Sequence, residues 1–188
     1  MPVVPPTKSR LIVTREGRAI TASVPKPVVI VDSREQTPFS FQLFSNWIAS
    51  TEIKALPTGD YSVQGMQDLI ALERKSLADA VGSVLQNRER FLRECERLAS
   101  YKHKAILIEA SFTEMKSPYR FTKDVRAHPN GVVGTLDAIE ARYGIPIIYT
   151  STDRALAEER AASWLSKHFT YAWLEQNGLG RVLQEGDL

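Results

Sequence analysis

Long apolar runs, cysteine pairs and a clear excess of one charge are all lacking from this chain of 188 residues. A single cysteine can form neither an internal disulfide nor a cysteine-based metal cage. The longest purely apolar runs are far shorter than the roughly 20 residues that span a bilayer. The first residues, Met1-Pro2-Val3-Val4, lack the apolar segment of a signal peptide. These absences predict a soluble protein of a reducing compartment, the cytoplasm, without a membrane partner.

Composition supports a folded domain and leaves the partner open. Hydrophobic residues make up 43% of the chain, which is enough for a core, and the length fits one domain with a short appendage. The 24 Lys and Arg residues nearly cancel the 22 Asp and Glu residues, but segment 88–104 alone holds six basic against three acidic residues. This uneven distribution favours an anionic partner, although a solvated helix face has the same composition.

Strand-like and helix-like segments alternate along most of the chain. Val28-Val29-Ile30-Val31 is a continuous β-branched run, which is typical of a buried central strand. Because strands and helices alternate repeatedly, the sequence predicts an α/β domain. The other predicted strands cover 60–64, 68–75, 105–109 and 145–150, and the predicted helices cover 43–50, 77–85, 87–101, 132–143 and 152–175.

The two ends of the chain are predicted to lie outside this α/β domain. Segments 11–14 and 19–24 flank a Gly-containing turn and read as a β-hairpin. Pro25 and Pro27 separate that hairpin from the strand that follows. We therefore expect a hairpin appendage over 1–27, the α/β domain over 28–175 and a tail over 176–188.

The predicted strands 60–64 and 68–75 bring acidic side chains together. With residues 65–68 as the connecting loop, Asp60 lies opposite Glu73. Cross-strand neighbours are roughly 5 Å apart at Cβ, so two carboxylates on one face could grip a cation. Oxygen ligands of this kind suit a hard ion such as Mg²⁺ or Mn²⁺.

Lys75 adds a positive charge to the same face, because side chains alternate along a strand and only Arg74 points the other way. A metal that polarises phosphate and a positioned cation are what phosphodiester hydrolysis needs. Each feature also has an ordinary structural explanation: a turn, a surface ion pair, or a helix cap in which Asp79 follows Ser76. However, charges at the end of the apolar run 69–72 are costly unless partnered, which favours a site.

Three ordered motifs resemble the XPF-type (ERCC4-like) nuclease domain of the restriction-endonuclease-like, PD-(D/E)xK superfamily. They are 29–35, Gly59-Asp60-Tyr61, and 73–79 with its Glu-Arg-Lys start and closing Asp. Stand-alone bacterial and phage forms look most similar. The resemblance covers roughly 27–150 and implies a restriction-endonuclease-like core, a central mixed β-sheet flanked by helices.

The resemblance also implies roles for individual residues. Asp60, Glu73 and Asp32 are implied to be ligands of Mg²⁺, for which Mn²⁺ can substitute, with Asp32 acting directly or through water. Lys75 is implied to position or activate the attacking water. The other residues implied are the catalytic Glu35, Arg74 and Asp79 and the DNA-binding Arg34, Arg88 and Arg90.

The implied function is that of a divalent-metal-dependent DNA endonuclease acting on branched, flap or junction DNA in repair, recombination or replication. Two alternatives stay open: a non-catalytic DNA-binding or scaffold subunit of a nuclease complex, and a PD-(D/E)xK exonuclease or restriction-type nuclease. The helix over 152–175 could serve core packing or a homodimer interface, and the family favours a homodimer. Too few residues follow it for a helix-hairpin-helix module, so an accessory DNA-binding partner is also expected.

Overall fold

The centre of the protein is a six-stranded mixed β-sheet. The computed structural model describes residues 11–15, 18–117 and 128–181. Across the sheet the strands are, in order, β4 (Ser50–Lys54), β3 (Val28–Asp32), β5 (Tyr61–Val63), β6 (Ile70–Ser76), β7 (His103–Glu109) and β8 (Ile147–Tyr149). β5 is antiparallel to both neighbours, whereas the remaining pairs are parallel. The predicted α/β fold with a central mixed sheet is confirmed.

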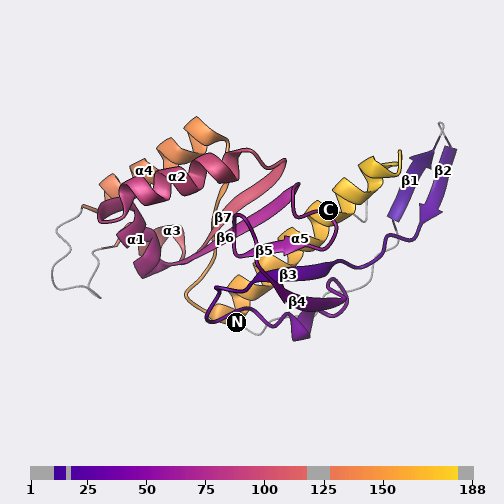
Figure 1. Ribbon diagram of the computed structural model, residues 1–188, viewed down its shortest axis with the longest axis horizontal. Helices are drawn as coiled ribbons and strands as arrows, with labels where there is room; N and C mark the ends of the chain where they lie inside the picture. Colours follow the sequence, from indigo (N-terminus) through magenta and orange to yellow (C-terminus); the bar gives the residue numbers. More distant parts are fainter. Residues whose placement is uncertain (1–10, 16–17, 118–127, 182–188) are drawn as a thin grey trace.

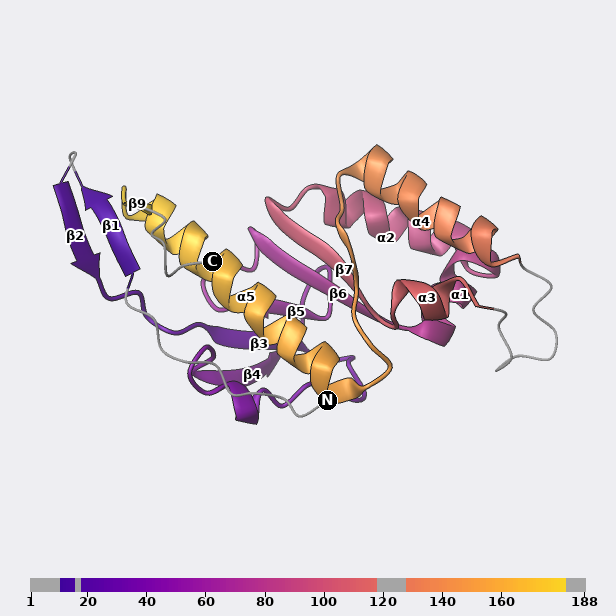
Figure 2. The ribbon, with the colours of Figure 1, turned by 180° about the vertical axis from the view of Figure 1, so that it is seen from behind.

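Helices cover both faces of this sheet (Figures 1 and 2). One face carries α1 (Leu77–Leu85), α2 (Arg88–Ala99) and α4 (Pro129–Tyr143), and the other carries the long α5 (Arg154–Gln176). The short α3 (Phe112–Met115) follows β7. No helix in the described part of the chain is long and apolar enough to cross a membrane.

The two layers make two hydrophobic cores, one on each side of β6. Ile70 and Leu72 pack in the core beneath α5, while Ala71 packs in the core beneath α1, α2 and α4. Continued alternation along the strand points Glu73 and Lys75 to the side of α1 and α2. Charged side chains on β6 are thus divided between two different environments.

One predicted helix is wrong. Residues 43–50 were expected to be helical, but only the 3-10 turn Gln42–Phe44 forms there, and Ser50 already begins β4. β4 lies at the edge of the sheet, and most of its residues are exposed, including Ile53. An exposed edge strand has little apolar alternation, so its sequence lacks the pattern that identifies strands.

Helix α5 contributes its apolar side to the core. Ala161, Trp164, Leu165 and Phe169 are buried against the sheet, so the core-packing explanation is confirmed for these residues. The helix begins at the Asp153 cap, whose side chain accepts a hydrogen bond from the backbone N of Ala155 at 3.0 Å.

The predicted N-terminal hairpin is present, as β1 (Leu11–Arg15) paired with β2 (Arg18–Ala22). A two-residue strand that was not predicted, β9 (Gly180–Arg181), pairs antiparallel with the other edge of β1. These three strands form a separate small sheet beyond the end of α5, away from α1, α2 and α4 (Figures 1 and 2). A strand of two residues is too short for any periodic signal in the sequence.

Candidate active site

Three acidic side chains meet in one part of the sheet, which we call the carboxylate edge: the last residue of β3 (Asp32), the residue before β5 (Asp60) and the middle residue of β6 (Glu73). The antiparallel direction of β5 brings its beginning to the edge where β3 and β6 end. Tyr61 pairs with Leu72 across the strands, and the same register puts Asp60 opposite Glu73, as predicted.

The residues around Asp60 explain why the Gly-Asp-Tyr motif takes this form. Gly59 has a φ of 80°, and a Cβ there would lie 3.2 Å from the Leu72 carbonyl oxygen, so glycine is needed. The backbone N of Asp60 donates to that same carbonyl at 2.9 Å. The Tyr61 hydroxyl accepts from the Phe39 backbone N at 2.9 Å, and the two rings stack. Gly59 and Tyr61, the two residues next to Asp60, therefore fix the backbone at this position.

Asp60 is a poorly compensated carboxylate. Its Oδ2 accepts from the Arg74 backbone N at 2.7 Å, and no hydrogen bond to its Oδ1 is present within the described residues. Burial raises the pKa of Asp60 to about 6, a rise that this backbone hydrogen bond opposes and the charge of Glu35 supports. Such a group gains from a nearby cation.

Glu73 shares its surroundings with Lys75 and with Glu94 of α2. The Lys75 ammonium donates to Glu73 Oε1 at 2.9 Å and to Glu94 Oε1 at 3.4 Å, and it lies 5.0 Å from the centre of the Phe91 ring. Burial, followed by a hydrogen bond with Glu94, raises the pKa of Glu73 well above its usual value. Burial alone would lower the pKa of Lys75, but Glu73 and Glu94 raise it overall. Lys75 is therefore a protonated cation in this arrangement.

Asp32 is held by its own neighbours. Arg34 donates from Nε to Oδ1 at 2.7 Å and from Nη2 to Oδ2 at 2.9 Å, and the Leu56 backbone N also donates to Oδ2 at 2.7 Å. The Arg34 hydrogen bond lowers the pKa of Asp32 to about 2 against the opposing effect of burial. Both carboxylate oxygens are thus engaged, which suits contact with a metal through water better than direct ligation.

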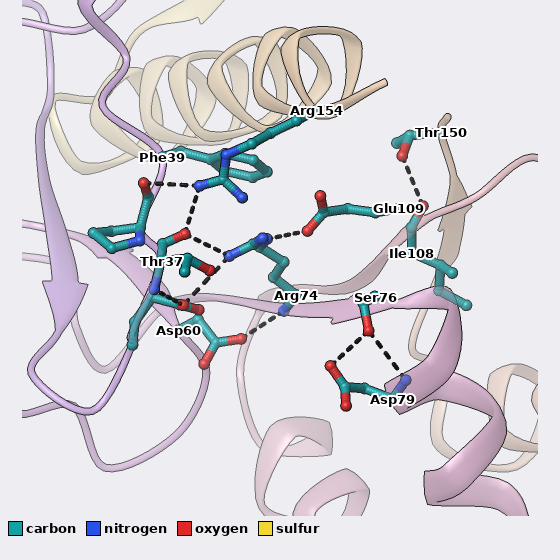
Figure 3. Close-up of polar contacts among 12 residues, drawn as sticks. Thr37, Phe39, Asp60, Arg74, Ser76, Asp79, Ile108, Glu109, Thr150 and Arg154 are labelled. Atoms are coloured by element: carbon teal, nitrogen blue, oxygen red, sulfur yellow. Dashed lines mark hydrogen bonds and ion pairs between the residues drawn. The ribbon is translucent and has the colours of Figure 1, made fainter. Parts of the chain in front are cut away.

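Strand alternation turns Arg74 away from Glu73 and Lys75. Its side chain reaches toward Glu109 and lies near Arg154 of α5 (Figure 3). Its Nε donates to Glu109, and its Nη1 donates to the Thr37 carbonyl at 2.8 Å and lies 3.3 Å from Glu35 Oε1. Arg154 from α5 donates to the same Thr37 carbonyl. Glu35 and Arg74 are thus joined in one network that reaches the α5 side of the sheet, and both residues also line the cleft described next.

The remaining predicted residues are divided between the cleft and its surroundings. Asp79 accepts from the Ser76 hydroxyl at 2.6 Å as part of the cap of α1, and it borders the cleft. Arg90 also borders the cleft, whereas Arg88 faces α4 and lies 3.5 Å from the Thr135 hydroxyl. The cleft has a volume of about 770 Å³, and Asp32, Arg34, Asp60, Glu73, Lys75, Arg90, Glu94 and Arg97 are among the residues that line it.

The fit to a divalent cation rests on the chemistry of the donors. Within residues 11–15, 18–117 and 128–181, no three His, Cys, Asp or Glu side chains form a closed ligand set. Arg34 holds Asp32, and the Lys75 ammonium lies between two glutamates. Asp60 and Glu73 are nonetheless oxygen donors whose pKa values burial raises, so a hard cation would stabilise their ionised forms.

Glu94 is the site residue that sequence reasoning missed. It lies on α2, far along the chain from the motif residues, and in sequence it looks like one more charge on a polar helix face. The available signal was its spacing: Glu94 lies three residues after buried Phe91 and so shares that side of the helix.

Comparisons with known proteins agree with this geometry. The ERCC4 domain model matches residues 31–159. XPF from Aeropyrum pernix aligns with a TM-score of 0.59 and 28% identity over 74% of this chain and 60% of that chain. XPF from Aeropyrum pernix in complex with DNA aligns with a TM-score of 0.56 and 29% identity, covering 76% and 66%.

A protein of Methanocaldococcus jannaschii named as an ATP-dependent RNA helicase is 31% identical over 137 residues. That match covers 72% of this chain but only 15% of the helicase, so this chain corresponds to a small part of that relative. The match to the ERCC4 domain model also covers more than half of this chain. It includes the carboxylate edge and most of the cleft. With its sheet, motifs and register in agreement, the chain belongs to the ERCC4 domain family.

Proposed function

We propose that this protein is a divalent-metal-dependent DNA endonuclease that hydrolyses phosphodiester bonds in branched, flap or junction DNA during repair, recombination or replication. The observation that carries the proposal is the placement of Asp60, Glu73 and Lys75 in one cleft, where buried carboxylates exceed cations. Membership of the ERCC4 domain family supports it. The structure of XPF from Aeropyrum pernix in complex with DNA is the relative that suggests the substrate.

Asp60 and Glu73 are the residues that would hold Mg²⁺ or Mn²⁺, and Asp32 would contribute through water. When bound, such an ion polarises a phosphate oxygen and lowers the pKa of water. Lys75 is a buried ammonium beside these carboxylates, so its part is to orient the attacking water by hydrogen bonding and to stabilise negative charge on phosphate. In this arrangement Lys75 acts as a fixed cation and does not accept a proton.

DNA would approach through arginines at the open side of the cleft. The Arg34 side chain is 73% exposed although it is tied to Asp32, and Arg90 is exposed on α2. Both can reach phosphates, which are the groups that basic side chains contact in any DNA sequence. Arg88 has a more distant role because it faces α4. A homodimer through α5, on which Tyr171 is 40% exposed, and an accessory DNA-binding partner complete the proposal.

The proposal is tested by cleavage of end-labelled and internally labelled fork, flap, nicked and linear duplex DNA with Mg²⁺. We expect cleavage at internal positions of branched substrates by the wild type. Lys75→Met is expected to lower the rate by about 10²- to 10³-fold, as for the loss of one charge-stabilising group. Glu96→Gln, an exposed change on α2, is the matched control.

The result would contradict the proposal if Lys75→Met cut as fast as the wild type. Release of only terminal nucleotides would instead identify an exonuclease, and cleavage of linear duplex at fixed sequences would identify a restriction-type enzyme. DNA binding without cleavage by the wild type would identify the scaffold alternative.

A further inference from the structure

The Lys75 ammonium is enclosed on three sides. Glu73 accepts its hydrogen bond at 2.9 Å, Glu94 at 3.4 Å, and the Phe91 ring lies beneath it with the ring centre at 5.0 Å. The Lys75 side chain is only 9% exposed. Two of the three groups, Phe91 and Glu94, come from α2 and not from the sheet. The lysine is therefore held in place mainly by α2, which lies outside the three motifs 29–35, 59–61 and 73–79.

The charges around Lys75 balance only when Glu94 is counted together with a divalent cation. When ionised, Asp60, Glu73 and Glu94 bring three negative charges, which match the one positive charge of Lys75 and the two of the cation. A divalent cation on Asp60 and Glu73 would neutralise those two carboxylates and withdraw Glu73 from Lys75. A buried ammonium without a counterion is strongly unfavourable. Glu94 is the carboxylate that remains for it.

Helix α2 fixes Glu94 firmly enough for this task. Phe91, Cys95 and Leu98 are buried in the core beneath the helix, which prevents it from rotating. Arg97 follows one turn later and also lines the cleft, so its positive charge lies near Glu94. Glu94 thus lies near two cations, Lys75 and Arg97, which suits a counterion.

We propose that Glu94 is the positioning residue of Lys75: it holds the ammonium in the cleft as a dedicated counterion and so leaves Glu73 available to the divalent cation. The inference deepens the proposed nuclease function and rests on it for its catalytic part. Two other roles make different predictions. A metal ligand would alter metal affinity even without Lys75, and a purely structural residue would alter folding alone.

Amine reactivity of Lys75 tests the contact without any need for cleavage. Wild type, Glu94→Gln and Glu94→Ala are labelled under native conditions with acetic anhydride at several pH values, and each lysine is quantified by mass spectrometry. If Glu94 holds and shields the Lys75 ammonium, its loss should increase labelling of Lys75 severalfold relative to an exposed lysine. Exposed Lys167 serves as the internal reference, and Glu96→Gln as the control variant. Unchanged labelling of Lys75 in folded Glu94→Gln would overturn the proposal.

Mn²⁺ binding and single-turnover cleavage then separate the roles. We expect Glu94→Gln to lower the cleavage rate about 10- to 100-fold. This is the loss of activity typical for residues that orient a metal ligand or a catalytic group. The Mn²⁺ dissociation constant, measured by calorimetry on the full chain, should rise as well, because Glu73 then stays paired with Lys75. A rise of the same size when Lys75 is also replaced by Met would make Glu94 a ligand and overturn the positioning role. A rate that merely follows the folded fraction in thermal unfolding would also overturn it. If the wild type fails to cut DNA, the labelling result still decides the Lys75–Glu94 contact.

Discussion

The charged side chains on the two faces of β6 are compensated to different extents. On the α5 side, Arg74 contacts Glu109 and Glu35, and Arg154 donates to the same Thr37 carbonyl as Arg74, so two cations lie near two carboxylates (Figure 3). On the cleft side, Lys75 lies among Glu73, Glu94 and Asp60, and burial raises the pKa values of Asp60 and Glu73. The comparison separates a framework from a site: satisfied charges hold loops in place, and unsatisfied ones are available to a cation and a substrate.

The framework side also ties α5 to the loop after β3. Glu158 accepts hydrogen bonds from the Ser40 hydroxyl at 3.2 Å and from the Phe41 backbone N. Arg154 lies over the Phe39 ring with its guanidinium carbon 4.8 Å from the ring centre. The first turns of α5 therefore hold the loop that follows β3 and its last residue, Asp32.

The largest effect is expected on the cleft side, from Asp60→Asn. This substitution keeps the acceptor for the Arg74 backbone N but removes a negative charge that the cation needs. Cleavage with Mg²⁺ should fall about 10²- to 10³-fold, similar to the loss of other transition-state-stabilising groups. The circular dichroism spectrum should stay that of the wild type. If cleavage continues at the wild-type rate, the cleft side is not the site and the comparison fails.

On the framework side, Arg74→Ala should act mainly on stability. It leaves Glu109 and Glu35 without their shared cation and the Thr37 carbonyl without one donor. We expect the free energy of unfolding in urea to fall by about 3 kcal/mol, as when one partner of a buried ion pair is removed. Arg93→Ala, which loses only a distant contact of an exposed side chain, is the control. Equal stability of both variants would show that the α5 network is not a framework.

The pH dependence of the free energy of unfolding gives a further test of the difference between the cleft side and the α5 side of β6. The pKa of Asp60 is about 6 in the folded protein against 3.8 ordinarily, so the folded state binds this proton more tightly. The resulting stabilisation is complete below pH 3.8 and is lost as pH rises through 6. Without metal, Asp60→Asn should therefore be more stable than the wild type at pH 7 by about 3 kcal/mol, with the advantage gone near pH 4. An advantage that does not vary with pH would rule out Asp60 titration as its source.

The smallest effect is expected from Arg154→Ala. Loss of its hydrogen bonds to the Thr37 and Pro38 carbonyls should cost about 1 kcal/mol. It should also speed hydrogen exchange at the Phe39 and Phe41 amides, with the exposed Arg160→Ala on the same helix as control. A large loss of cleavage at unchanged stability would instead assign Arg154 to the site.

Local pattern and register predicted what lies close in sequence. The pairing of Asp60 with Glu73 and the division of Arg74 from Lys75 follow from strand alternation and one hairpin, and both agree with the structure. Glu94 could not be placed, because its approach to Lys75 depends on how α2 packs across the sheet. Edge strand β4 carried no apolar alternation, and β9 is too short to carry one.

The pairing of β9 with β1 makes the described chain almost circular. Val13 pairs with Arg181 and Thr14 with Gly180, so β1 and β9, the first and last described strands, lie next to each other, away from α1, α2 and α4 (Figure 2). A short linker between them would close the ring with little change in loop entropy. New ends could then be opened at an exposed turn such as the one at Gly65. Permuting the order of the chain in this way would leave every contact of Lys75 in place.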